Sequence, residues 1–117
     1  MRIINRLLAV LKPKQGYIDW MTSLPDGDED LIPSLEQARE QDCMALLIPE
    51  FDTDEQAFEF VLKQSKTIIK MQCEAWDTRE ELWPKNMDRR LLKKWFDIEI
   101  HSEVIDTMRS PIEREEY

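Results

Sequence analysis

Residues 43–51 read CMALLIPEF, and the first seven of them form the longest apolar run in the chain. A short apolar run that a proline closes is typical of a buried strand, because proline cannot donate a hydrogen bond to a neighbouring strand. We therefore expect a buried strand over residues 43–48, with the thiol of Cys43 in the core. The rest of the chain is expected to cover this strand or to pair with it.

A long amphipathic segment follows this strand. Thr53 and Gln56 have the spacing of a capping box, in which each side chain accepts a hydrogen bond from the other residue's backbone N–H. The apolar residues after them fall on one broad stripe: Ala57, Phe58, Val61, Leu62, Ile68, Ile69, Cys73 and Trp76. We expect one helix over residues 54–76, packed against the strand.

Two further strands are expected, one near each end of the chain. Residues 3–11 read IINRLLAVL, and from Leu7 onward the apolar residues do not alternate with polar ones, which favours a strand buried on both faces. From Phe96 the chain reads FDIEIHSEVID, in which apolar and polar residues alternate. That period of two predicts a strand with one buried face and one polar face.

Shorter helices are expected over residues 17–24, 33–40 and 89–95, the last of them capped by Asp88. Together the elements predict an α+β fold, or an α/β fold, with a small three-stranded sheet and helices packed on at least one face. The connections are long enough for parallel pairing but do not require it. We expect one globular domain over residues 1–109 and a charged, frayed tail over residues 110–117.

The net charge of the chain is −9, and it is unevenly spread. Residues 26–60 carry twelve acidic side chains and one basic side chain. An acidic surface repels nucleic-acid phosphates, so direct binding of nucleic acid is not expected. An acidic block of this kind either faces a basic partner or only keeps the protein soluble.

The N-terminal segment and the cysteines bear on the compartment. Residues 1–15 match a signal peptide poorly, because Asn5 and Arg6 interrupt the apolar run. No part of the sequence approaches the roughly 18 consecutive apolar residues that span a bilayer. Cys43 and Cys73 lie in apolar surroundings and have no Cys-x-x-Cys spacing. We expect a cytoplasmic protein that does not bind membranes and keeps two reduced thiols; a disulfide between them is the alternative.

His101 is the single histidine, and the strand period places it on one face with Glu99 and Glu103. A histidine between carboxylates is charged more easily and can act as an acid or a base, and one nitrogen with two oxygens can bind a metal. These three residues are therefore the candidate catalytic residues. A polar strand face open to water explains the same pattern and is the favoured interpretation, so no metal site is expected.

The chain has four tryptophans, a residue type that is frequent at the centres of protein interfaces. Three of them fall on predicted apolar helix faces. Trp83 fits no such stripe and precedes a proline. It is the candidate for an exposed residue that binds a partner.

The sequence lacks the residues that several kinds of binding site require. The chain has only two glycines and no glycine-rich loop, which argues against nucleotide binding through backbone amides. One histidine and two cysteines in apolar segments give no zinc-ligand spacing. No cofactor is expected.

Four pieces of the sequence resemble a group of short bacterial proteins of unknown function. They are INR and KPKQ within residues 4–15, LIPE at 47–50, LWP at 82–84 and WFDIEIHS at 95–102. The resemblance implies a bacterial, cytoplasmic, stand-alone domain. It implies no activity and no functional residues.

The sequence therefore predicts a small acidic protein that acts through protein–protein contacts, as an accessory or regulatory factor, with a protein partner or with further copies of itself. The missing catalytic constellations favour this function over an enzyme. The alternative is a small enzyme, or a ligand- or metal-binding protein, that uses His101 with the neighbouring carboxylates. A third possibility is an acidic mimic of nucleic acid that binds a basic protein.

Overall fold

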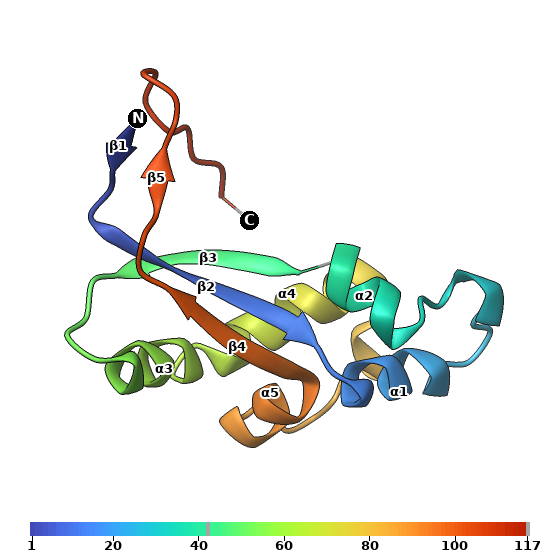
Figure 1. The fold of residues 1–117 in the computed structure, drawn as a ribbon. Helices are drawn as coiled ribbons and strands as arrows, with labels where there is room; N and C mark the ends of the chain where they lie inside the picture. Colours follow the sequence, from blue (N-terminus) through green and yellow to red (C-terminus); the bar gives the residue numbers. More distant parts are fainter. Residues whose placement is uncertain (42, 117) are drawn as a thin grey trace.

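Figure 1 shows the fold in a computed structural model, which describes residues 1–41 and 43–116. The predicted α+β class is confirmed, because these residues form five helices and a three-stranded antiparallel sheet of order β3-β2-β4. The strands of this sheet are β2 (Arg6–Pro13), β3 (Met44–Pro49) and β4 (Phe96–His101). The helices are α1 (Gln15–Ser23), α2 (Leu35–Gln41), α3 (Asp54–Leu62), α4 (Ser65–Trp76) and α5 (Arg89–Trp95). Among the described residues, no helix is both long enough and apolar enough to cross a membrane.

The sheet and the helices form two layers. Helices α3, α4 and α5 lie on one side of the sheet, and α1 and α2 lie at one end of it (Figure 1). The buried side chains of β2 point to the helices and recur at every second residue: Leu7, Ala9, Leu11 and Pro13. The side chains between them are only half-buried. The prediction that this strand is buried on both faces is therefore wrong, because helices cover one face only.

Strand β3, which the CMALLIPEF stretch predicts, lies at an edge of the sheet. Its existence is confirmed, since β3 begins at Met44, but its burial is one-sided. Ile48 is 1% exposed and packs in the core, whereas its neighbour Leu47 is 50% exposed. Cys43 is half-buried, and its thiol donates to the carbonyl oxygen of Arg39 at 3.1 Å. The fully buried thiol is that of Cys73, and both cysteines are free.

The single helix expected over residues 54–76 is two helices. The predicted capping box of Thr53 and Gln56 is present and begins α3, but α3 ends at Leu62 and α4 begins at Ser65. The hydroxyl of buried Ser65 donates to the carbonyl oxygen of Leu62. This local bond occupies the carbonyl oxygen of Leu62, which in a continuous helix would accept from the backbone N–H four residues later. The apolar spacing agrees with the break, since Leu62 and Ile68 are separated by six positions.

Aromatic side chains fill the junction between α1, α5 and β4. The rings of Tyr17 and Trp20 stack at 5.9 Å, and both rings contact Trp95. Gly16 permits this junction, since a Cβ atom there would lie 2.8 Å from the carbonyl oxygen of Lys94. Helix α1 is thus packed against α5 and the start of β4.

The first and last predicted strands both break before their ends. The segment expected over residues 3–11 forms β1 (Arg2–Ile3) and β2, and the segment after Phe96 forms β4 and β5 (Ile105–Asp106). The two breaks lie opposite each other, and β1 pairs antiparallel with β5 beyond them. We call β1, β5 and the residues that join them to the sheet the arm. Figure 1 shows that the arm rises on the side of the sheet opposite the helices.

The residues after β5 form a tail over 107–116. Residues 110–116 are exposed and belong to no helix or strand. The tail turns back from the tip of the arm toward the sheet (Figure 1). Tyr117, the last residue of the predicted tail, lies outside the described residues.

Candidate functional site: the open face of the sheet

The outward side of the three-stranded sheet carries the predicted site residues. We call it the open face, and define it by the outward side chains of the three strands: Arg6, Leu8, Val10 and Lys12 of β2, Ala45 and Leu47 of β3, and Asp97, Glu99 and His101 of β4. The register places Leu8 between Leu47 and His101. Val10 likewise lies between Ala45 and Glu99, so the two rows that cross all three strands run from an apolar side chain on β3 to a charged or ionisable one on β4.

A chain of ion pairs lines the β4 side of the open face. The ammonium of Lys12 lies 3.1 Å from Glu99, and Nε2 of His101 lies 3.4 Å from the other oxygen of the same carboxylate. The hydrogen bond from Lys12, followed by that from His101, holds the pKa of Glu99 below its ordinary value. Further along, Arg39 of α2 donates to Asp97 at 2.8 Å.

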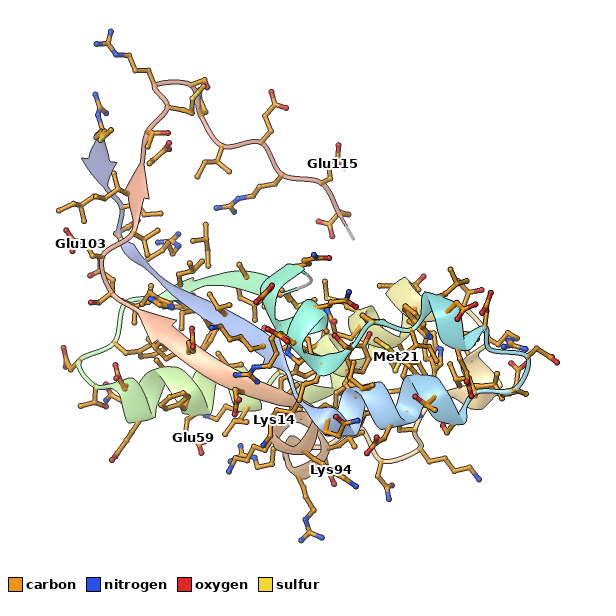
Figure 2. The ribbon with its side chains drawn as sticks, turned by 45° about the vertical axis from the view of Figure 1, so that its right-hand side comes forward. Lys14, Met21, Glu59, Lys94, Glu103 and Glu115 are labelled. Carbon is orange, nitrogen blue, oxygen red and sulfur yellow. The ribbon has the colours of Figure 1, made fainter. Side chains whose placement is uncertain are left out.

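The structure brings together two of the three predicted catalytic residues. His101 and Glu99 share the open face, as the period of two predicted. Glu103 does not join them, because β4 ends at His101 and the alternation of faces ends with it. Figure 2 shows Glu103 at the bend between β4 and β5, away from the helices. Among the residues described, no group of three or more His, Cys, Asp or Glu side chains is placed to hold a metal ion.

The chemistry open to His101 is limited by its surroundings. Its side chain is 51% exposed, and the carboxylate beside it is shared with Lys12. Exposed ion pairs of this kind contribute little free energy, because water screens them. A general acid or base acts best where a substrate can be held against it out of water, and His101 lies on an open strand surface.

Trp83 is half-buried and packs against the core. Its indole N–H donates to the carbonyl oxygen of Asp77 at 2.7 Å. The ring therefore helps to hold the segment after α4 and is not the exposed side chain that the sequence predicted. Its role in binding a partner stays a prediction.

Asp77 itself is ion-paired with Arg79 at 2.7 Å. The hydrogen bond from the Arg79 side chain, with a second one from its backbone N–H, lowers the pKa of Asp77 to about 2. This pair orders the loop in front of Trp83.

A groove of about 620 Å³ runs along β4 on the helix side. Phe58 and Phe96 line it together with positively charged lysines and negatively charged carboxylates, among them Lys14, Lys93 and Glu59. No buried side-chain nitrogen or oxygen among the described residues lacks a hydrogen-bond partner. A binding site for a polar ligand usually has buried polar groups that stay unpaired until the ligand binds. We therefore assign no function to this groove.

The exposed apolar side chains were not predicted from the sequence. Seven large ones are exposed among the described residues: Met1, Ile3, Leu31, Leu47, Ile105, Met108 and Ile112. Four of the seven lie on the arm or the tail, Met1 directly precedes the arm, and Leu47 lies on the open face. The one local sign is the polar triplet at 101–103, which interrupts the alternation and marks the bend.

No protein-family model, curated protein or solved structure matches the chain. The resemblance to a group of bacterial proteins therefore stays a prediction.

Proposed function

We propose that this protein acts by binding another protein chain through the open face and the arm, as an accessory or regulatory factor. The observation that carries the proposal is the gathering of exposed apolar side chains on the arm and on the strand beside it. Single exposed apolar residues are ordinary, but a contiguous group of them marks an interaction surface.

The composition of the open face supports the same proposal. An antiparallel sheet with one uncovered face normally alternates apolar and polar residues, with the polar ones facing water. Here four outward side chains are apolar: Leu8, Val10, Ala45 and Leu47. None of the four belongs to the core or packs against it. Covering them with a partner would remove apolar surface from water at about 25 cal/mol per Å².

The alternative, acid–base chemistry or ligand binding at His101, has less support. Glu99 is already paired with Lys12, and Glu103 lies at the bend. The contact of Glu99 with Lys12 and His101 on the rim of a contact surface fits a role in orienting a partner, since rim charges favour specificity and the rate of association.

Site-specific photo-crosslinking in the cells that make the protein tests the proposal. A photoreactive amino acid replaces Leu47, Ile105 or, as a control on the exposed side of α4, Lys66. We expect adducts of one defined mass from positions 47 and 105 and none from position 66. Adducts that form equally at all three positions, or at none, would contradict the proposal.

A further inference from the structure

We infer that the chain bound by the open face is a second copy of this protein, in a two-fold dimer where the arm of each copy lies across the open face of the other. This inference rests on the proposed function and names its partner. A two-fold contact of this kind is self-complementary, so each favourable contact occurs twice.

The arm has apolar side chains that the rest of the described chain leaves exposed. It pairs only two residues of β1 with two of β5, and an isolated two-stranded ribbon is marginally stable in water. Ile3 is 74% exposed and Ile105 is 43% exposed. The radius of gyration is 15.7 Å, whereas a compact domain of this length has about 13 Å. Figure 1 shows that the arm and the tail project from the body formed by the sheet and the helices.

The arm of one copy is held away from its own open face. It continues β2 and β4 past the end of the sheet, and the N–H of Ile4 donates to the carbonyl oxygen of Val104 at 3.0 Å at the bend. This hydrogen bond joins the two strands at the base of the arm, so the arm leaves the sheet as a paired ribbon. In a two-fold arrangement the face of the other copy lies where the arm already extends.

The lengths of the two surfaces agree. Residues 102–106 of the arm span about 17 Å at the rise of an extended chain, and the eight residues of β2 span about 26 Å. One arm therefore covers most of the length of a partner's open face. The apolar side chains of the arm, Ile3 and Ile105, can then meet the apolar β3 side, where Leu47 is exposed.

The charges of the two surfaces are complementary. The open face, with Arg39 at its end, has three basic side chains against two acidic ones, in a chain whose net charge is −9. The arm and the tail have the opposite balance, with five acidic side chains against three basic ones: Glu103, Asp106, Glu113, Glu115 and Glu116, against Arg2, Arg109 and Arg114. Opposite charge across an interface favours the encounter and penalises other partners.

Sedimentation velocity of the full chain, from micromolar to submillimolar concentration, tests the dimer. We expect a species of twice the chain mass of 14.0 kDa. Leu47→Glu and Ile105→Glu each place a charge inside the interface, twice in the dimer, and should raise the dissociation constant about tenfold or more, which corresponds to about 1.4 kcal/mol or more. Leu31→Glu is the matched control, since Leu31 is 72% exposed and lies outside both surfaces. It should leave the dimer unchanged.

Mixing the two variants tests which surfaces meet. A pair made of one Leu47→Glu chain and one Ile105→Glu chain keeps one unaltered arm on one unaltered face. In a dimer of either variant with itself, both arm–face contacts contain a substitution. We expect the mixture to form a dimer at concentrations where neither variant does, and a mixture that stays monomeric would overturn the reciprocal arrangement.

A monomer at every concentration, or a dimer that both variants leave intact, would overturn the inference as a whole. The crosslinking experiment distinguishes this failure from a failure of the proposed function. Crosslinked adducts from positions 47 and 105 whose mass shows a different protein would support the proposed function and reject the second copy. Absence of any adduct at those positions would reject both.

Discussion

The backbone N–H of Ile4 donates to the carbonyl oxygen of Val104 at 3.0 Å, at the bend where the sheet gives way to the arm. Ile4→Pro removes this donor, and proline is tolerated poorly where a strand needs its N–H. We expect the arm to lose protection from amide hydrogen exchange at Asp106, whose pair with Arg2 is the next hydrogen-bonded one along the arm, while the amides of the core strand β2 keep theirs. Ile4→Val retains the N–H and should exchange like the parent protein. Equal protection of the arm in the proline variant would show that this bond does not hold it.

Neighbouring residues of β3 test its one-sided burial. Ile48 is 1% exposed, and Ile48→Ala should lower the free energy of unfolding by about 2–4 kcal/mol, because it leaves a cavity under the sheet. Leu47 is 50% exposed on the other face, and Leu47→Ala should cost the monomer less than about 1 kcal/mol. Urea unfolding at low protein concentration measures both. Similar costs at the two positions would mean that the open face is covered within one chain.

The elements that could be predicted are those whose determinants are local. Thr53 and Asp88 begin their helices as expected, because a cap depends on residues three positions apart. The alternation after Phe96 correctly placed Glu99 and His101 on one face. In each case the residues that decide the structure are neighbours in the sequence.

The open face could not be predicted, because its exposure depends on distant parts of the chain. Leu8 is as apolar as Leu7, and only the position of the helices decides which of them is covered. The partners of the charged residues are also distant in sequence, since Lys12 pairs with Glu99 and Arg39 with Asp97. Glu103 does not share the face of Glu99 and His101, because β4 ends at His101, where the polar triplet at 101–103 interrupts the alternation.

The close approach at Gly16 predicts a strong response to a single methyl group. A Cβ atom there would lie 2.8 Å from the backbone oxygen of Lys94, which cannot rotate away as a side chain can. Gly16→Ala should therefore lower the free energy of unfolding by about 1–3 kcal/mol. Gly27→Ala is the matched control, since its Cβ would meet its nearest atom at 3.4 Å. A stability change at Gly16 no larger than that at Gly27 would show that α1 shifts without cost.

The two thiols should differ in reactivity. Burial raises the pKa of the Cys73 thiol to about 12, and the thiolate is the reactive form. Cys43 is half-buried at the start of β3. With an alkylating reagent near neutral pH, we expect one thiol per folded chain to react readily and the second only after denaturation. Cys43→Ser should abolish the first reaction; a variant that still reacts readily in the folded state would contradict the burial of Cys73.

The pair of Asp77 and Arg79 predicts a specific dependence of stability on pH. Because the pKa of Asp77 in the folded protein is lowered to about 2, the pair stabilises the fold above pH 4, where the unfolded chain is also ionised. This contribution is lost as pH falls from about 4 to about 2, since Asp77 then binds a proton more readily in the unfolded chain. Asp77→Asn should therefore cost stability at pH 7, and the cost should shrink as the pH falls through that range. Denaturant unfolding at several pH values measures it, and Arg79→Gln should reduce the same pH dependence, because it removes the guanidinium but keeps the backbone N–H that also donates to Asp77. A cost of Asp77→Asn that stays constant from pH 7 to pH 2 would mean that Asp77 acts through its shape and hydrogen bonds rather than through its charge.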